Sequence, residues 1–389
     1  MKTKRFSGWS LLVTALLSLL LTLALAFGAL WALIGPEGLS MAEAMVLINA
    51  RFVGDHDIGK AADAAMDGLI TGLGDRWSYY VDAEGYENLK NSKDNSYVGI
   101  GVTVSYPEGE EGLYVEAVAE NGPAAAAGLQ HGDTILAVGE VRLSGEDRNR
   151  GTELIQGEAG TQVELLLRGA GGEERTVSVT RGRVEEHPVS CELLTDGAGL
   201  ITIKNFNSRC ADEAIAAVED LRERGAERLV FDVRNNGGGF LDELTKLLDY
   251  LLPAGPIFRS QTKAGRETVV SSDADCVEMP MAVLVNENTY SAAELFAAEL
   301  QEWNWGEVVG VQTFGKGFSQ QTFPLLNGGA VNLSTAKYFT GQGNCLIGVG
   351  LTPDRVVELD GDQAEKLRAR TLDPAEDPQL QAAIAAAPR

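Results

Sequence analysis

The sequence has few histidines and cysteines for its 389 residues, with three of the former and four of the latter. The histidines are His56, His131 and His187, and none stands in a pattern that pairs it with a nucleophile, so a Ser-His-Asp triad is not expected. An HExxH motif and paired CxxC motifs, the common signs of a zinc mechanism, are also lacking. We therefore predict no metal and no other cofactor.

Basic residues are also scarce, and the formal net charge is −24. Such a charge disfavours binding to nucleic acid and electrostatic docking on anionic lipid. Hydrophobic residues make up 44% of the chain, which is enough for sizeable cores, and no long low-complexity segment interrupts it. The roughly 350 residues beyond the N-terminal segment predict two or three globular domains.

One long apolar run lies near the N-terminus. Residues 11–33 carry no charge and follow Lys2, Lys4 and Arg5. At about 1.5 Å per residue such a helix crosses the ~30 Å hydrocarbon layer, and the positive flank places the N-terminus in the cytoplasm. A signal peptide cleaved after Ala24-Leu-Ala26 is the alternative. The length favours a single-pass anchor in the cell membrane, and either interpretation places the rest of the chain outside the cytoplasm.

All four cysteines follow this segment, in a part of the chain where disulfides can form. Four cysteines allow three pairings, and we favour Cys191 with Cys210 and Cys276 with Cys345. Buried free thiols are the alternative.

A serine and a lysine in two nearby segments suggest a hydrolase. Ser291 follows an apolar run and a turn, and Lys316 lies in a glycine-flanked turn. A serine needs a neighbour that takes its proton, and a lysine can do so only if its surroundings keep it neutral. Apolar residues near the lysine could provide such burial: Val311, Phe314, Phe318 and Phe323. We interpret the pair as a Ser-Lys peptidase site.

Each member of the pair has a simpler explanation. Ser291-Ala-Ala-Glu294 also fits a capping box at a helix start. Lys316 alone fits a solvated turn lysine. The run from Gly310 to Gly317 resembles a phosphate loop, but Gly317 stands where such a loop needs serine or threonine, so a nucleotide site is not predicted.

A glycine-rich turn favours the catalytic interpretation. Residues 228–233 read as a buried strand, residues 234–239 as the turn Arg-Asn-Asn-Gly-Gly-Gly, and residues 240–252 as a helix. Backbone amides at such a helix start can stabilise developing negative charge. An ordinary tight turn is the alternative.

Three segments together resemble the signature blocks of carboxyl-terminal processing peptidases, the tail-specific serine proteases. They are residues 232–239, 285–294 and 313–320, and residues 335–354 resemble the block that follows the lysine. The resemblance extends from about residue 45 to the end. It implies Ser291 as nucleophile, Lys316 as general base and Gln320 as the residue that orients the lysine.

The same resemblance implies an oxyanion hole made of the Ala292 amide and one glycine amide, for which we choose Gly238. Two residues depart from the family pattern. Gly237 stands where proline is frequent, and Tyr290 stands where small residues are usual, which could narrow the cleft.

Residues 96–182 resemble a PDZ domain, with strands expected at 97–102, 134–138 and 160–168. Such a domain binds a peptide's C-terminal carboxylate with loop amides while the peptide adds a strand. The donors would be Gly99, Ile100 and Gly101. A small β-domain without a ligand is the alternative.

The expected fold is a multidomain α+β chain with a crotonase/ClpP-like peptidase core. Its parts are a cytoplasmic stub and anchor (1–35), a helical region (41–95), the PDZ domain (96–182), the peptidase (183–360) and a tail (361–389) with a helix at 377–384. The resemblance also implies a homodimer. The predicted function is a membrane-anchored serine endopeptidase that acts on proteins with free C-termini, with an activating partner left open. Its rivals are a binding protein with an inactive hydrolase domain and, more weakly, a non-peptidase hydrolase.

Overall fold

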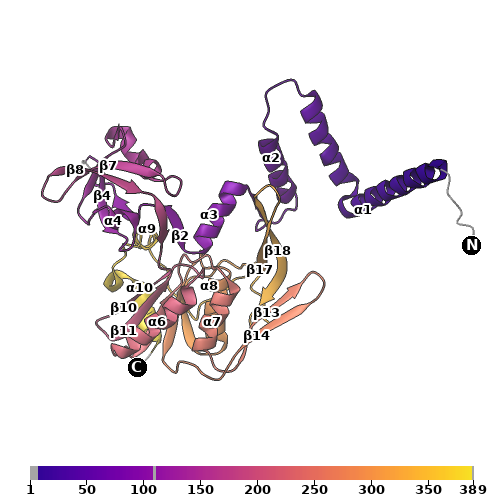
Figure 1. Ribbon diagram of the computed structural model, residues 1–389. Helices are drawn as coiled ribbons and strands as arrows, with labels where there is room; N and C mark the ends of the chain where they lie inside the picture. The colour runs from indigo at the N-terminus through magenta and orange to yellow at the C-terminus, as the bar shows by residue number, and fades with distance from the viewer. Residues whose placement is uncertain (1–7, 108–110, 388–389) are drawn as a thin grey trace, which may run out of the picture. The chain divides into compact units, whose positions relative to one another are not determined.

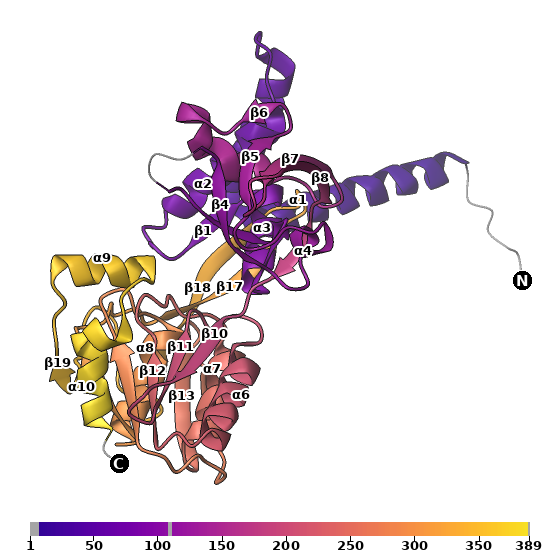
Figure 2. The same ribbon diagram turned by 90° about the vertical axis from the view of Figure 1, so that its left-hand side faces the viewer.

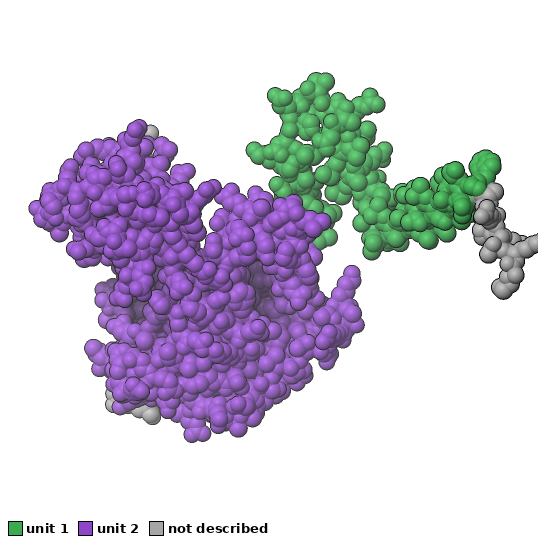
Figure 3. Space-filling model, in the orientation of Figure 1, with its two compact units in different colours: residues 1–73 green, residues 74–389 purple. Residues whose placement is uncertain are grey.

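The computed structural model describes residues 8–107 and 111–387, and the chain divides into two compact units, residues 1–73 and 74–389 (Figure 3). The first unit contains α1 (Gly8–Arg51) and α2 (Ile58–Thr71). In the described part of the chain α1 alone is long and apolar enough to cross a membrane, and none of its residues is buried. A signal sequence meets the same criteria. The helix kinks at Gly35, which has φ 66° and precedes Pro36.

An aspartate caps the start of α2. The Asp57 carboxylate accepts hydrogen bonds from the amides of Gly59 and Lys60. The expectation of a wholly helical region to residue 95 is wrong in one part, because Tyr79–Val81 forms the strand β1 before α3 (Ala83–Lys93). Strand β1 pairs with a strand of the catalytic region, so tertiary pairing determines its structure.

Within the second unit, the PDZ region has a sheet with the order β3-β4-β5-β7-β8, and β6 pairs with β5. The strands are β3 (Val102–Ser105), β4 (Leu113–Val118), β5 (Thr134–Val138), β6 (Val141–Arg142), β7 (Gln162–Arg168) and β8 (Glu174–Thr180). They pack with the short helices α4 (Pro123–Ala126) and α5 (Gly151–Ile155) around a core of aliphatic side chains, beside the 3-10 turn η1 (Gly145–Arg150). The chain enters and leaves this region through an antiparallel ribbon of β2 (Ser96–Gly99) and β9 (Gly182–Glu185).

A six-stranded sheet forms the centre of the catalytic region, in the order β10-β11-β12-β15-β16-β19. Strand β10 is antiparallel to β11, and the remaining pairs are parallel. The strands are β10 (Val189–Leu193), β11 (Ala198–Ile203), β12 (Arg228–Asp232), β15 (Met281–Val285), β16 (Gly306–Gly310) and β19 (Arg355–Val356). Strand β12 matches the predicted strand at 228–233.

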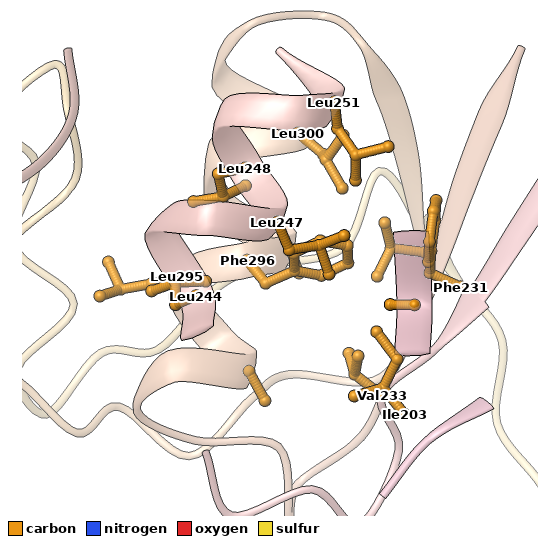
Figure 4. Close-up of a cluster of buried hydrophobic side chains, with 14 of the residues drawn as sticks. Ile203, Phe231, Val233, Leu244, Leu247, Leu248, Leu251, Leu295, Phe296 and Leu300 are labelled. Carbon is orange, nitrogen blue, oxygen red and sulfur yellow. The ribbon is translucent and has the colours of Figure 1, made fainter. Parts of the chain in front are cut away.

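Helices cover both faces of this sheet (Figures 1 and 2). On one face lie α6 (Cys210–Glu223), α7 (Leu241–Leu251) and α8 (Ala292–Glu302), and Figure 4 shows leucines of α7 packed with Phe296 of α8 and Phe231 of β12. On the other face α10 (Pro378–Ala386) covers Val230, Ala282 and Leu284. Helices α7 and α10 match the predicted helices at 240–252 and 377–384. Helix α9 (Gly361–Ala369) and the 3-10 turn η2 (Pro374–Glu376) precede α10.

A second sheet has the order β1-β18-β13-β14, with β17 also paired to β18. It contains β13 (Gly255–Thr262), β14 (Glu267–Ser272), β17 (Phe318–Pro324) and β18 (Ala330–Phe339). Strand β17 begins two residues after Lys316, so this sheet fixes the end of the lysine loop.

The favoured disulfides are not formed, since all four cysteines are free thiols. Cys210 is buried in the first turn of α6, whereas Cys191 is exposed on β10, where its Sγ lies 4.0 Å from Asp220 Oδ2. Cys276 is half-buried and Cys345 is exposed. The alternative of buried free thiols describes Cys210 alone.

Candidate active site

A cavity of about 440 Å³ brings together residues from distant parts of the chain. Ser291 and Lys316 both line it, as expected from the sequence. The other lining residues are Trp77, Tyr79, Leu89, Lys93, Gly237, Gly239, Phe240, Leu241, Leu244, Phe258, Tyr290, Ala292, Leu295, Ser319, Gln320, Thr322, Asn332 and Tyr338.

Ser291 occupies the sharp turn between β15 and α8. Its backbone has φ 60° and ψ −127°, outside the regions that a residue with a Cβ prefers. Such strain persists only where the surroundings impose it, and it clusters at functional sites. Although Ser291 is at the N-cap position of α8, its side chain makes no capping bond. The hydroxyl therefore does not cap the helix, so the serine half of the capping box is absent, although the Glu294 side chain accepts from the Ser291 amide.

Glu294 supports the lysine loop from inside the protein. Its side chain is fully buried and accepts hydrogen bonds from the Thr313 hydroxyl and from the amides of Gly315 (2.7 Å) and Lys316 (3.1 Å). Burial raises the pKa of this carboxyl, and the hydrogen bonds partly oppose that effect. The glutamate thus connects the first turn of the serine helix to the loop that carries the lysine.

Lys316 is buried beneath aromatic rings, with 9% of its surface exposed. Its Nζ lies 4.3 Å from the ring centroid of Trp77 and 5.9 Å from that of Tyr290. Burial, aided by the positive charge of Lys93 and opposed by Asp75, lowers the pKa of Lys316 to about 8. The lysine is not a solvated turn residue, and near neutral pH a useful fraction of it is neutral.

Tyr338 lies between the two groups. Its hydroxyl donates to the Lys316 carbonyl at 2.5 Å and is within hydrogen-bonding reach of the Ser291 side chain. Burial raises the pKa of Tyr338 well above its ordinary value, so the hydroxyl keeps its proton. Tyr338 is thus placed to orient both the serine and the lysine loop.

The glycine turn passes directly beside the serine. A Cβ on Gly238 would lie 2.8 Å from the Ala292 amide nitrogen and 2.8 Å from the Ser291 Cβ, so only glycine fits. The Gly238 amide, however, donates to Asn236 Oδ1 at 2.8 Å. It is therefore not free for a substrate oxyanion in this structure. Gly237 and Gly239 line the cavity, and Ala292 begins α8, where amides lack an intrahelical acceptor.

Gln320 lines the same cavity, but its side chain is turned to its own sheet. Its Nε2 donates to the Phe318 carbonyl at 2.8 Å and to the Ser334 hydroxyl at 3.1 Å. No hydrogen bond joins Gln320 to Lys316 within residues 111–387. Its role as the residue that orients the lysine stays a prediction.

The two departures from the family pattern are in contact with each other. A Cβ on Gly237 would lie 2.5 Å from the Tyr290 hydroxyl, so the tyrosine ring takes space that a larger residue at 237 would need. Tyr290 also packs against Trp77 and Phe314, with ring centroids 5.9 and 5.5 Å away. The resulting aromatic wall forms one side of the cavity.

The predicted PDZ loop joins β2 to β3. Ile100 is buried and its carbonyl accepts from Ala124, while Gly101 has φ 80° and its carbonyl accepts from Ala119. Strand β3 follows the loop and forms an edge of the PDZ sheet. An edge strand can accept a peptide as an additional strand.

Several site residues were not predicted from the sequence. Lys93, at the end of α3, carried no recognisable signal. Tyr338, on β18, lies within residues 335–354, which resemble a family block, but it was given no role from the sequence. Trp77, two residues before β1, was also given no role from the sequence. The three histidines do not line the cavity.

Comparisons with known proteins agree with this arrangement. Residues 197–357 match Peptidase family S41, and residues 114–169 match the PDZ domain. The carboxy-terminal processing protease CtpA of Bacillus subtilis is 31% identical over 314 residues, which cover 80% of this chain and 67% of that protein. The chain belongs to the S41 family of carboxy-terminal processing proteases.

Other S41 proteins are more distant. A CtpA-like serine protease of Staphylococcus aureus is 29% identical over 318 residues, which cover 80% of this chain and 63% of its own length, so the chain spans less than two thirds of that relative. Among solved structures, the photosystem II D1 C-terminal processing protease aligns with a TM-score of 0.50 and 26% identity over 89% of this chain and 92% of that one. An S41-family protein of Bacteroides fragilis aligns with a TM-score of 0.57 and 17% identity over 86% of this chain and 91% of that one, which shows a shared fold.

Proposed function

We propose that this S41 protein is a membrane-anchored serine endopeptidase that captures protein C-termini in its PDZ region and cleaves the chain near them. The observation that carries the proposal is the strained Ser291 turn, with its uncapped hydroxyl, in one cavity with a buried lysine of lowered pKa. The apolar helix α1 and the edge strand β3 support the anchor and the peptide-binding part.

The chemistry follows from the positions of these groups. Neutral Lys316 takes the hydroxyl proton as Ser291 Oγ attacks the scissile carbonyl carbon. The oxyanion is stabilised by the Ala292 amide and by an amide of the glycine turn, with Gly238 providing the close approach. Protonated Lys316 then gives its proton to the leaving amine, which leaves an ester on Ser291. Water attacks this ester while Lys316 takes a proton from the water, and the bond between the acyl carbon and Ser291 Oγ breaks. The lysine returns the proton to Oγ, which restores the serine and releases the new carboxylate end of the peptide.

Three residues support the pair in this scheme. Tyr338 and Glu294 hold the lysine loop, and Gln320 orients Lys316 once a substrate is bound. A change of the Gln320 side chain from its hydrogen bonds with Phe318 and Ser334 is then part of activation. The resemblance to the family suggests that a homodimer also contributes, and an activating partner stays open.

The domain boundaries expected from the sequence are retained, with one change in the peptidase domain. The anchor is residues 1–35, the PDZ region 96–182 and the tail 361–389. The peptidase comprises residues 183–360 together with β1, since β1 pairs with β18. With the N-terminus in the cytoplasm, the catalytic part lies outside the cytoplasmic membrane.

The test compares the exported portion, residues 36–389, with its Ser291→Ala and Lys316→Ala variants on an unstructured protein with a free or amidated C-terminus. We expect both variants to lose at least ~10³-fold in kcat and amidation to weaken wild-type cleavage. Wild-type turnover in Lys316→Ala would refute the general-base role. No cleavage by any form, with the free tail still bound, would favour a binding protein.

A further inference from the structure

A second lysine lines the catalytic cavity without an acidic partner. Lys93 ends α3, and its Nζ lies 3.4 Å from Asn207 Oδ1 and 5.3 Å from the ring centroid of Phe240. None of the ion pairs formed within residues 8–107 and 111–387 includes it. Its ammonium therefore meets a neutral oxygen and an aromatic face, and it shares the cavity with the positive charge of Lys316.

The place of Lys93 is fixed by the protein. The Ser208 amide donates to the Lys93 carbonyl at 3.1 Å, and Asn207 Nδ2 donates to the Ser92 carbonyl at 3.2 Å. The adjacent carboxylate is used elsewhere, because Asp94 accepts from Ser208 and Arg183. The ammonium is thus held on the cavity wall while a nearby acid is directed away from it. Such preorganisation is typical of a binding group.

The energetics favour a ligand for this charge. Burial lowers the pKa of Lys93, which reflects the cost of removing an ammonium from water. The Phe240 ring offsets only part of that cost. An anion that enters the cavity would recover the rest, and the anions that reach the cavity of a peptidase belong to its peptide substrate.

We propose that Lys93 is an anion-binding subsite of the cleft, which takes a carboxylate of the peptide close to the scissile bond. The proposal rests on the proposed peptidase function. The carboxylate can come from an Asp or Glu side chain or from the end of the substrate chain. In either case Lys93 determines which peptides bind well, in a protein whose own net charge is −24.

The test uses the full chain in detergent with Ser291→Ala, so that peptides bind without being cut. The probes are fluorescent pools of short peptides with random neutral flanks: a central Glu with an amidated end, a central Gln with an amidated end, and a central Gln with a free end. We expect one of the two carboxylate pools to bind roughly tenfold more tightly than the neutral pool. Which pool it is identifies the source.

Lys93→Met should abolish that preference, and Lys93→Arg should retain it. Lys90→Met is the matched control, because Lys90 lies on the same helix, pairs with Glu87 and does not line the cavity. The PDZ region is also proposed to bind the free C-termini of peptides. Only the part of the preference for a carboxylate pool that is lost in Lys93→Met therefore supports the proposal. Circular dichroism and thermal melting verify that each variant is folded.

Equal binding of all pools by the Lys93 form, or a preference that survives Lys93→Met, would overturn the proposal. The proposal would also be overturned if Lys93→Met, in the chain that retains Ser291, changed only the pH dependence of cleavage. Lys93 would then act only by changing the pKa of Lys316. Failure of the serine-competent chain to cut any substrate would instead count against the peptidase function. The binding result still judges the subsite in that case.

Discussion

The serine side of the cavity is built mainly from backbone, whereas the lysine side depends on side chains from distant parts of the chain. Ser291 lies between β15 and α8, two elements whose residues are almost all buried, and their packing imposes its positive φ. Lys316 lies in a loop that is held by Glu294 and covered by Trp77, more than 200 residues earlier in the chain.

This difference separates what short segments encode from what only the folded chain provides. A strand, a turn and a helix can place a serine from local sequence. A lysine with a lowered pKa needs water to be excluded on several sides, and here the rings that exclude it come from separate segments. Substitutions around the lysine should therefore change the chemistry, and substitutions around the serine should mainly change stability.

The largest effect is expected from Glu294→Ala. It leaves the donors to Glu294 without this acceptor, the Thr313 hydroxyl and the amides of Gly315 and Lys316 among them, each at about 1–3 kcal/mol. We expect the free energy of unfolding to fall by ~3 kcal/mol or more and kcat to fall at least ~10²-fold as the lysine loop moves. Denaturant unfolding and kcat measure the two. Glu287→Ala, an exposed acid in the loop before Ser291, should change neither, and a wild-type kcat in Glu294→Ala would contradict the role of Glu294.

Next comes Asp377→Ala, which affects the serine side. Arg234, at the start of the glycine turn, forms buried ion pairs with Asp232 at 2.6 Å and with Asp377 at 2.7 Å. Asp377 also caps α10. We expect the free energy of unfolding, measured with denaturant, to fall by about 3 kcal/mol through loss of the ion pair and by about 1 kcal/mol through loss of the helix cap. Asp373→Ala, which removes an exposed cap, is the control. A larger fall in kcat of the folded protein than in Glu294→Ala would reverse the comparison.

The pH dependence of kcat/KM tests the role of Trp77, whose ring covers Lys316. A general base must be neutral, so wild-type kcat/KM should be low below pH 8 and rise as pH passes through about 8, where Lys316 loses its proton. Trp77→Ala admits water, and since burial is the main cause of the lowered pKa, the rise should move to higher pH. Each unit of that shift lowers the rate at pH 7 about tenfold. Trp77→Phe should shift it less, and an unmoved pH profile in Trp77→Ala would exclude this role.

The smallest effect concerns Tyr290 and Gly237. Gly237→Ala should destabilise the protein by about 1–2 kcal/mol, because the added Cβ would lie 2.5 Å from the Tyr290 hydroxyl. In a Tyr290→Ser background the same change should cost less. Thermal unfolding of the two single variants and the double variant gives the coupling, and strict additivity would mean that the two residues are independent.

Much of the local structure was predictable from the sequence. The segments around Ser291 and Lys316 were interpreted as one site, and both residues line one cavity. The apolar runs on either side of the glycine turn predicted β12 and α7, and a terminal helix was predicted at 377–384, where α10 lies. These features depend on interactions within a few residues. The crotonase/ClpP-like character of the core and the homodimer stay predictions.

Long-range features could not be predicted in the same way. Strand β1 was expected to be helical. The expectation was wrong because β1 pairs with β18, which lies far along the chain and could not be identified as a partner from local sequence. The choice of Gly238 as a donor could not anticipate that the Asn236 side chain accepts its amide. Ser291-Ala-Ala-Glu294 has the letters of a capping box, but the serine caps nothing and the buried glutamate holds the lysine loop.

The pairing of β1 with β18 also affects the order in which the enzyme can mature. The Ser334 amide donates to the Ser78 hydroxyl across 256 residues of sequence, and the Trp77 that covers the lysine belongs to the same early segment. During synthesis this segment must wait, unpaired, until β18 emerges. A nascent or prematurely terminated chain that stops before residue 330 lacks the partner strand of its lysine cover. We therefore expect the chain to gain peptidase activity only after β18 has been synthesised and has paired with β1.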